Sequence, residues 1–387
     1  MRVLFMSTPV STHFAPSIPL GWALRAAGHE VLVAGQPDIL GAAHGAGLCT
    51  AVVGEYFDAL EPLTSSLPEG KRPIEVGHTR VRDGHWDDVN KIWLIHCRYL
   101  VSRYIELARE WKPDLIVADP LEFSALLVGG VLGVPTVNRR WGVDPAGVPG
   151  QEMAARTMGT MLGRLGLDAL PRPALVLDPC PPSLQVPEAP PSQGMRYIPF
   201  NGAGSLPDWA REKPRGHRRV CVSFGRLTAA MNGIPLFRTV VEAAGGLDGV
   251  ETILTLEPEF REALGPVPPS VRAVDPAPLN LFLDTCDAVV HHGGAGSTLT
   301  TTAFGLPHLV LPGITDTFVV ADRVVATGVG RTVDEAGPQN DPEVVRETLR
   351  GLLDDPGHAQ AATKLRDEVL AMPTPAEVVP ILEELAG

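Results

Sequence analysis

A chain of 387 residues is longer than one hydrophobic core ordinarily serves, so its length predicts two domains. Hydrophobic residues make up 44% and charged residues 20%, the balance of a globular protein, and no apolar run is long enough for a signal peptide or a membrane span. A net charge of −13 argues against binding to nucleic acid or to an anionic membrane, and five scattered cysteines without a C-x-x-C pair argue against a zinc or disulfide framework. We therefore expect a cytoplasmic protein with free thiols.

The first half opens with a βαβ unit. Its predicted elements, in chain order, are a strand at 3–6, a helix at 16–27, a strand at 30–34, a polar loop at 63–90, a helix at 91–111 and a strand at 114–118. The loop is rich in proline and glycine, and a loop of that length in a compact domain is usually functional or mobile.

The second half follows a proline-rich connection. The predicted elements from there on are the connection at 179–214, a strand at 218–223 and helices at 341–353 and 377–385. The strand at 218–223 leads into a turn with Gly225 and Arg226, which offers a cation to a phosphate group.

The most informative internal pattern is a repeat. Residues 114–119 run from an aspartate through an apolar strand to a polar residue, and residues 287–292 do the same. A Gly-x-Pro sequence follows each at nearly the same distance. Two halves on one plan predict two similar doubly wound domains that offer the carboxyl ends of their strands to a shared cleft. The alternative is that any two βα units look alike.

A glycine-rich turn, residues 291–298, lies between an apolar strand and a helix. Such a turn leaves backbone N–H groups free at the positive end of the helix, which makes an anion site, most often for phosphate. His292 adds a ring donor and Ser297 a hydroxyl, and Gly294 and Gly296 let a diphosphate approach the main chain. The alternative is a tight turn without a ligand.

His13 comes just after the first strand, where a side chain points into the cleft of a doubly wound domain. Asp119 ends a parallel strand of the same domain. A carboxylate hydrogen-bonded to one ring nitrogen fixes the tautomer and raises the basicity of the other, so this pair is a candidate general base for an acceptor hydroxyl. The alternative is a structural or incidental histidine.

The chain resembles the GT-B glycosyltransferases that attach sugars to macrolide and aromatic polyketide antibiotics. The resemblance covers essentially the whole chain, and its most specific part is His291 to Thr298 with Gly305-x-Pro307. The other matching motifs are Thr12-His13-x-x-Pro16, Gly28-His29-Glu30-Val31, Pro113-Asp114-Leu115-Ile116-Val117-x-Asp119, Arg140-Trp141-Gly142-Val143-Asp144-Pro145 and Leu177-Asp178-Pro179-Cys180-Pro181-Pro182-Ser183.

This resemblance implies an α/β protein with the GT-B fold, two doubly wound Rossmann-like domains that face a central cleft. Residues 1–200 would bind the acceptor, 201–216 would link the domains and 217–372 would bind the nucleotide sugar. Residues 373–387 would carry a helix that packs back on the N-terminal domain. The partners would be a nucleotide sugar and an apolar small-molecule acceptor, without nucleic acid or membrane; a homodimer is left open.

Site residues follow from the resemblance one by one. His13 would be the general base and Asp119 its partner, in a single displacement that inverts the anomeric carbon. No cofactor and no metal are implied, because the helix dipole and side chains neutralise the leaving diphosphate. The residues expected to bind the donor are Gly225, Arg226, Ala277, Leu279, His292, Gly294, Gly296, Ser297, Asp316 and Thr317. The residues expected to bind the acceptor are Phe14, Trp86 and Trp141.

Three departures from relatives bear on the donor. Thr317 stands where many relatives have glutamine after the aspartate, Thr300 where users of uridine diphosphate have a glutamate for the ribose hydroxyls, and Pro276 where a tryptophan often covers the base. The missing glutamate fits deoxythymidine, which lacks one of those hydroxyls. We therefore predict a deoxysugar donor on thymidine diphosphate.

Three rival functions stay open at the level of sequence. Gly294-x-Gly296 followed by Asp316 faintly imitates the dinucleotide fingerprint of an NAD(P)-dependent oxidoreductase, although Leu299 stands at the third glycine position. A nucleotide-sugar epimerase would need an acid and a base on both faces of the sugar. A non-catalytic glycosyltransferase-like helper would not need His13 and Asp119.

Overall fold

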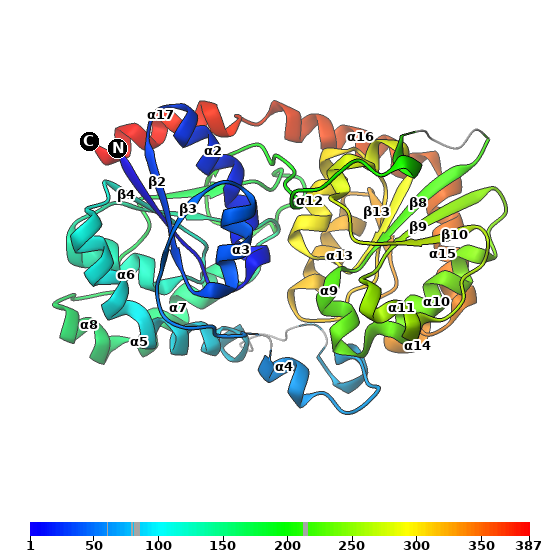
Figure 1. Ribbon diagram of the computed structural model, residues 1–387, viewed down its shortest axis with the longest axis horizontal. Coiled ribbons are helices and arrows are strands. Elements are labelled where there is room, and N and C mark those ends of the chain that lie inside the picture. Colours follow the sequence, from blue (N-terminus) through cyan, green and yellow to red (C-terminus); the bar gives the residue numbers. More distant parts are fainter. Residues whose placement is uncertain (60, 79, 81–85, 212–215) are drawn as a thin grey trace.

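The chain folds into two lobes that lie side by side, each built on one parallel sheet (Figure 1). This computed structural model describes residues 1–59, 61–78, 80, 86–211 and 216–387. The first sheet has the order β3-β2-β1-β4-β5-β6-β7. Its strands are β1 (Arg2–Met6), β2 (Glu30–Gly35), β3 (Cys49–Val52), β4 (Leu115–Ala118), β5 (Thr136–Arg139), β6 (Leu175–Asp178) and β7 (Gln193–Gly194).

The second sheet repeats this plan, with the order β10-β9-β8-β11-β12-β13. Its strands are β8 (Arg218–Ser223), β9 (Val250–Thr255), β10 (Val271–Val274), β11 (Ala288–His291), β12 (His308–Val310) and β13 (Gly330–Thr332). Counted from its own first strand, it has the order that the first sheet shows from β3 to β6, which is the order of dinucleotide-binding folds. The prediction of two doubly wound α/β domains is confirmed.

Helices cover both sheets (Figure 1). Those of the first lobe are α1 (Ser11–Phe14), α2 (Ile18–Ala26), α3 (Pro37–Gly45), α4 (Glu61–Ser66), α5 (Trp86–Trp111), α6 (Phe123–Leu132), α7 (Gly147–Thr157) and α8 (Gly159–Leu165). From the second lobe to the end of the chain they are α9 (Gly225–Thr228), α10 (Ile234–Gly245), α11 (Pro258–Leu264), α12 (Ala295–Ala303), α13 (Asp316–Ala326), α14 (Ala336–Gln339), α15 (Pro342–Asp354), α16 (Pro356–Ala371) and α17 (Pro375–Ala386).

The predicted loop at 63–90 is more ordered than its composition indicates. It contains most of α4, the 3₁₀ turn η2 (Pro73–Val76) and the first turn of α5, which begins at Trp86 rather than at 91. Asp87 and Asp88 make that first turn polar, which hides it from a search for apolar periodicity but suits the positive end of a helix. Part of this predicted loop, residues 79 and 81–85, lies outside the described residues.

The internal repeat of the sequence has a structural counterpart. Asp114 exchanges two backbone-directed hydrogen bonds with Arg2 at the start of β1, since the Arg2 amide donates to its carboxylate at 2.6 Å and its own amide donates to the Arg2 carbonyl at 2.9 Å. Asp287 makes the same pair with Arg219 in β8, at 2.8 and 2.7 Å. Each aspartate therefore sets the register of the fourth strand of its half against the first.

The last helix returns to the first lobe, so the two ends of the chain lie together (Figure 1). Val378, Val379 and Leu382 of α17 are buried in one cluster with Val3 of β1 and Ile18 of α2. Thr374 caps this helix, because its hydroxyl accepts from the Glu377 amide while the Glu377 carboxylate accepts from the Thr374 amide.

The chain passes between the lobes twice, and the two passages are bonded to each other. The amide of Arg196, just after β7, donates to the carbonyl of Pro373 at 2.6 Å. Its guanidinium donates to the carbonyls of Met372, at 3.1 Å, and Leu370. The passage that leaves the first lobe is thus tied to the passage that returns to it.

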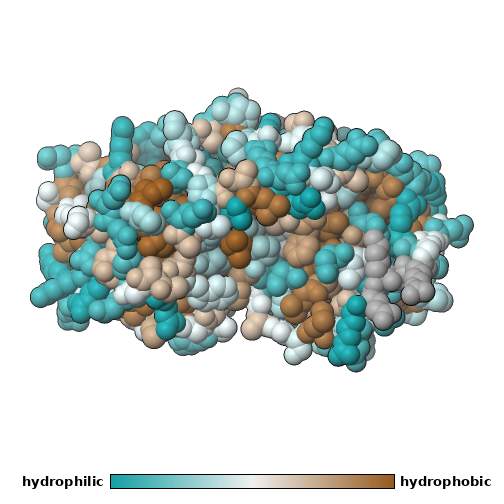
Figure 2. Space-filling model, turned by 90° about the horizontal axis from the view of Figure 1, so that it is seen from above, coloured by the Kyte–Doolittle hydropathy of each residue, from teal (hydrophilic) through white to brown (hydrophobic). Residues whose placement is uncertain are grey.

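Apolar side chains also join the lobes. Val143 of the first lobe and Leu184 of the connection are buried in one cluster with Leu299, Val320 and Leu365 of the second half. On the face seen in Figure 2, hydrophobic residues lie in separate patches among hydrophilic ones, as on most globular proteins. None of the helices in the described ranges combines the length and the hydropathy needed to cross a bilayer.

Candidate active site

The two lobes present equivalent strand ends to each other. In the first sheet β1 and β4 are neighbours, and in the second β8 and β11 are, which is where the strand order reverses and where doubly wound sheets bind ligands. His13 follows β1 and Asp119 follows β4. Gly225 follows β8 and His292 follows β11. The predicted site residues therefore come from the switch points of both lobes.

His13 and Asp119 are connected through a third residue, Thr8. The Thr8 hydroxyl donates to Oδ2 of Asp119 at 3.0 Å, and Nδ1 of His13 lies 2.7 Å from the same hydroxyl oxygen. Because the single hydroxyl hydrogen goes to the carboxylate, the Nδ1–H of the ring donates to the hydroxyl oxygen. The expected direct histidine–carboxylate bond is thus replaced by a relay. Its consequence for the tautomer is the same, because the proton is held on Nδ1 and Nε2 carries the lone pair.

Asp119 is fixed by further donors. Its Oδ2 accepts from the Ser7 hydroxyl at 2.9 Å and from the Thr8 amide at 2.7 Å, and its Oδ1 accepts from the Leu121 amide at 3.0 Å. Burial lowers the pKa of His13 to about 4, against the opposing effect of the Asp119 charge. The imidazole is therefore neutral near pH 7 and can accept a proton.

Two tryptophans hold the ring of His13. Trp141 stacks on it with ring centroids 3.9 Å apart, and Trp93 of α5 lies tilted at 5.7 Å. Trp141 thus touches the candidate base, as its predicted place in the cleft requires. Trp93 was not predicted; it lies two helical turns after Trp86 on the same face of α5, so helical spacing from Trp86 is the signal that could have found it.

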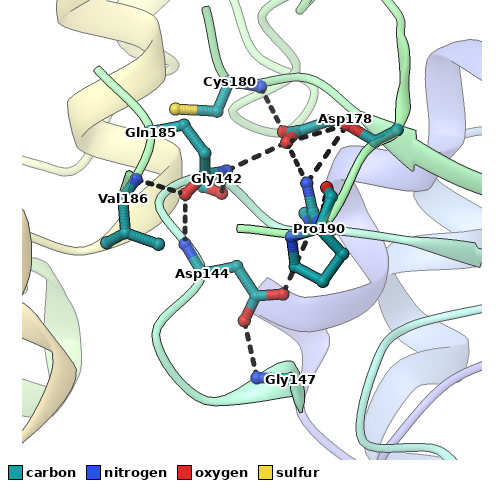
Figure 3. A network of polar contacts seen from close by, with 10 residues as sticks. Gly142, Asp144, Gly147, Asp178, Cys180, Gln185, Val186 and Pro190 are labelled. Carbon is teal, nitrogen blue, oxygen red and sulfur yellow. Dashed lines mark hydrogen bonds and ion pairs between the residues drawn. The ribbon is translucent and has the colours of Figure 1, made fainter. Parts of the chain in front are cut away.

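The loop that carries Trp141 is fixed by the polar network drawn in Figure 3. Arg140 donates to Asp178 at 2.6 Å, to the carbonyl of Pro190 at 2.9 Å and lies 3.5 Å from Asp144. Gln185 donates to Asp178 and to the carbonyl of Gly142, both at 3.0 Å, and accepts from the Asp144 amide at 2.9 Å. With its ion pairs buried and shared among several partners, this network holds the loop at both sides of Trp141.

Gly142 brings the same loop against the second lobe. A Cβ atom on Gly142 would lie 3.3 Å from the Cβ of Ala295, the first residue of α12, and 3.4 Å from a methyl group of Leu299. Residues that are neighbours in sequence, Trp141 and Gly142, thus touch the candidate base on one side and the candidate phosphate helix on the other.

The glycine-rich turn has the geometry of an anion site. Gly293 has φ of +90°, and a Cβ there would lie 3.0 Å from the carbonyl oxygen of Thr317, so the turn needs glycine at this position. Gly294 caps α12, whose first hydrogen bond runs from the Thr298 amide to the Gly294 carbonyl. The amides of Gly296 and Ser297 precede that bond, and they lie at the positive end of the helix.

The His292 ring lies beside this turn. A Cβ on Gly294 would lie 2.4 Å from its Nε2, and one on Gly225 would lie 3.6 Å from its Cε1. Burial lowers the pKa of His292 to about 4, so the ring is neutral near pH 7. A neutral ring beside helix amides can donate one N–H to an anion, and Gly225 and Gly294 leave the room for it.

A pair of buried histidines, His291 and His308, lies under the turn. The Gly293 amide donates to Nδ1 of His291 at 3.0 Å, and Nε2 of His291 lies 3.0 Å from Nδ1 of His308. His308 Nε2 in turn lies 3.5 Å from the Thr302 hydroxyl. Since His291 accepts at Nδ1, its proton is on Nε2 and both rings are neutral. Burial lowers the pKa of His308 to about 3, and burial together with the neighbouring His308 and His292 lowers the pKa of His291 well below its usual value.

Asp316 begins α13 next to the turn. The Thr315 hydroxyl donates to its Oδ1 at 3.0 Å, and Thr315 itself has φ of +29°, a strained value for a branched residue. Burial raises the pKa of Asp316, although the Thr315 bond opposes this. Thr317, the other residue expected at the sugar, is buried, and its hydroxyl donates to the carbonyl of Ile314. Because of that bond, the Thr317 side chain points toward the loop that precedes α13.

The segment expected beside the nucleobase is joined to α12. Asn201 accepts from the Asn280 amide at 3.3 Å and donates to the hydroxyl of Thr300 at 3.1 Å. Leu279 is buried and Ala277 half-buried against the cluster that contains Phe282. The hydroxyl of Tyr197 lies 3.1 Å from that of Thr300, so Thr300 is surrounded by uncharged partners.

The structure places two of the expected residues elsewhere, Phe14 and Arg226, while nothing in it tests the expected acceptor role of Trp86. Phe14 is 1% exposed and packs with Val3 and Ile18 in the core, because it turns inward where its neighbour His13 turns to the cleft. Arg226 forms an exposed ion pair with Glu259 at 2.9 Å. Trp86 is half-buried at the start of α5. These positions argue against contact of Phe14 with an acceptor and of Arg226 with a phosphate.

Residues that the sequence did not indicate complete the site. Thr8, Gln185, Tyr197 and Asn201 each bond to an expected residue or to its loop. Polar residues in irregular segments carry no periodic signal, so spacing could not have found them.

Family comparisons identify the chain. Residues 22–225 match the family described as Erythromycin biosynthesis protein CIII-like, N-terminal domain, and residues 238–385 match the C-terminal domain of that family. The chain is a glycosyltransferase of this family. The predicted resemblance is confirmed, and the oxidoreductase and epimerase alternatives fall away.

Two curated relatives match over nearly their full length. This glycosyltransferase is 35% identical to L-demethylnoviosyl transferase of Streptomyces niveus, over 98% of this chain and 96% of the relative. It is 31% identical to 3-alpha-mycarosylerythronolide B desosaminyl transferase of Saccharopolyspora erythraea, over 100% of this chain and 99% of the relative.

A solved structure confirms the GT-B fold. Spinosyn rhamnosyltransferase SpnG matches with a TM-score of 0.88 and 37% identity, over 99% of this chain and 100% of that chain. SpnG structures complexed with thymidine diphosphate and with spinosyn aglycone match at a TM-score of 0.87.

Proposed function

We propose that this glycosyltransferase moves a deoxysugar from a thymidine-diphosphate donor to a hydroxyl of a polyketide-type acceptor, with inversion and without a metal ion. The observation that carries the proposal is the relay from Asp119 through Thr8 to His13, which leaves a neutral imidazole with a free Nε2 at the switch point of one lobe. The helix amides at the switch point of the other lobe supply the complementary anion site.

The reaction is a single displacement. The acceptor oxygen attacks the anomeric carbon as its proton passes to Nε2 of His13, and the bond from that carbon to the diphosphate oxygen breaks. Nδ1–H keeps its bond to Thr8, and the Asp119 charge stabilises the imidazolium that forms. The diphosphate leaves with its electron pair and is stabilised by the amides of Gly296 and Ser297, the His292 N–H and the α12 dipole.

Thymidine rather than uridine diphosphate is supported by the surroundings of Thr300. A ribose clamp would need a carboxylate here, whereas Thr300 bonds to Tyr197 and Asn201. SpnG has been solved with thymidine diphosphate, and so has the glycosyltransferase VinC, at 28% identity and a TM-score of 0.81. Asp316 would meet the sugar hydroxyls, and Ala277 and Leu279 would approach the base through their main chain.

Trp141, with Trp93, would line the acceptor side of the cleft, where their rings suit a large apolar aglycone. The printed name of one relative gives 3-alpha-mycarosylerythronolide B beside desosaminyl transferase, and SpnG has been solved with spinosyn aglycone, and we infer a polyketide-type acceptor from these two. No cofactor takes part in this proposal. A cytoplasmic location stays a prediction of the sequence, and a homodimer stays an open alternative.

The test is transfer from thymidine-diphosphate and uridine-diphosphate rhamnose to a panel of polyketide aglycones that includes the spinosyn aglycone. We expect a clear thymidine preference, the inverted anomer in the product, and full activity in EDTA. His13→Ala should lose transfer while it keeps thymidine diphosphate affinity by calorimetry. A uridine preference, retention of configuration or an active His13→Ala would each refute its part of the proposal, and a wild type that binds donor without any transfer would favour the non-catalytic helper.

A further inference from the structure

A segment of the first lobe is docked on the second lobe far from the polypeptide crossings. Residues 61–78, here called the strap, contain α4 and η2 and lie beneath the second lobe in Figure 1. Asn232 holds one part of the strap, because its amide donates to the carbonyls of Pro68, at 3.2 Å, and Lys71, at 2.9 Å. Arg72 holds another part and is 3% exposed.

Arg72 is bound by two residues at the end of α14. Its Nη1 donates to Oε1 of Gln339 and its Nη2 donates to Oδ1 of Asn340, both at 2.7 Å. Glu75 closes the arrangement, since it accepts from the Arg72 amide at 2.8 Å and from the Asn340 amide group at 3.2 Å. A buried guanidinium with two short side-chain bonds to the other lobe is a specific contact, and the Glu75 carboxylate of the strap lies 3.6 Å from its Nε.

Gln339 connects Arg72 to the loop before Asp316. Its Nε2 donates to the carbonyls of Pro312 and Val333, both at 2.8 Å, and its side chain is fully buried. With both amide hydrogens used, the side-chain oxygen is left to accept from Arg72. Pro312 begins the short loop that ends at Thr315, the strained residue whose hydroxyl orients the Asp316 carboxylate.

We propose that Arg72 of the acceptor lobe is a positioning residue for the donor sugar, acting through Gln339 on the loop 312–315 and hence on Asp316. The inference rests on the proposed function, in which Asp316 meets the sugar hydroxyls. A residue strained at +29° keeps its conformation when its surroundings over-determine it, and the Gln339 amide supplies that constraint from outside the loop. The sugar pocket is therefore completed only when the lobes are docked.

The test compares the affinities of thymidine diphosphate and thymidine-diphosphate rhamnose by calorimetry, because their ratio isolates the sugar. In Arg72→Met we expect unchanged affinity for thymidine diphosphate and at least a fivefold loss for the sugar nucleotide, with a raised donor KM. Gln339→Glu keeps an acceptor for Arg72 but loses the donor to the Pro312 carbonyl of the loop and the donor to the Val333 carbonyl, so it should show the same loss. Arg72→Lys, which can keep one of the two bonds, should restore part of it.

Asn232→Gly is the matched control. It removes two strap contacts, its φ of +58° suits glycine, and it does not touch the loop, so the affinity ratio should stay at the wild-type value. The inference is overturned if Arg72→Met and Gln339→Glu keep the wild-type ratio, or if both ligands weaken equally. A wild type that fails to bind thymidine diphosphate would instead refute the proposed function. Circular dichroism melting identifies any variant that does not fold, and the other variant then decides.

Discussion

The imidazole ring of His13 is stacked on the indole ring of Trp141, with 3.9 Å between the ring centroids and 28° between the planes. The neighbour of Trp141, Gly142, meets Ala295 at the start of the phosphate helix. The candidate base is thus positioned by a loop that also contacts the opposite lobe. Trp141, which is proposed to line the acceptor side of the cleft, thus also contacts the candidate base.

Replacing Trp141 should change the pH dependence of transfer. Burial holds the pKa of His13 near 4, so the neutral base is lost only as pH falls through that value. In Trp141→Leu water reaches the ring, and the pKa should rise toward 6.5, by roughly one unit or more. The acid limb of kcat/KM should move up accordingly, while Trp141→Phe should shift it less. An unmoved limb in Trp141→Leu would contradict the role given to the stack.

Thr8→Val should disable the relay without exposing Asp119. Valine keeps the backbone amide bond to Asp119 and the shape of the side chain but removes the hydroxyl between carboxylate and ring. We expect kcat to fall by about 10²-fold, within the usual range for positioned acid–base catalysis. Thr8→Ser keeps the hydroxyl and should stay near wild type. Equal activity of the two variants would mean that the hydroxyl is not used.

Gly294→Ala should weaken donor binding by crowding. The added methyl group would lie 2.4 Å from Nε2 of His292, so the ring must leave its place beside the turn. Overpacking of this kind costs about 1–3 kcal/mol, or roughly 5- to 150-fold in donor KM. Gly296→Ala is the comparison, since a Cβ there meets no atom within 4 Å, and it should bind thymidine diphosphate better than Gly294→Ala does. The reverse order in a calorimetric titration would refute this reading of the turn.

Acid should destabilise the protein through the histidines under the turn. The pKa of His308 is lowered to about 3 by burial, whereas an unfolded histidine titrates near 6.5. Between these values the unfolded chain binds a proton that the folded chain does not, so stability falls as pH falls, by about 1 kcal/mol per pH unit for each such group. Urea unfolding from pH 7 to 5 should show it. His308→Gln, which can still accept from His291 and donate to Thr302, should show a shallower decline; an identical decline would exclude His308.

The sequence predicted the parts of the site that a strand end or a glycine pattern marks. Asp119 and His292 were recognised as equivalent because the strands before them repeat. The aspartates that begin these two repeats, Asp114 and Asp287, make equivalent hydrogen bonds in the structure. A glycine that a turn requires for its positive φ, such as Gly293, can be recognised in the sequence as part of a glycine-rich pattern.

Side-chain direction was less predictable. Phe14 follows His13 by one residue yet lies in the core, because a short helix turns successive side chains to different sides. Thr8 and Gln339 act through contacts with residues far away in the chain or in irregular segments. Such contacts depend on tertiary packing, which leaves no periodic pattern in a single sequence.

The bond that ties the two passages at Arg196 has a mechanical consequence. Two adjacent, mutually bonded crossings constrain the lobes as a door hinge does, so the lobes can swing about that seam more easily than they can slide or twist. The seam runs near α17 at the upper edge of Figure 1, and the strap lies at the lower edge. If a bulky acceptor requires a wider cleft, the lobes would therefore rotate about the seam at one edge, and the strap at the other edge would break its bonds to the second lobe.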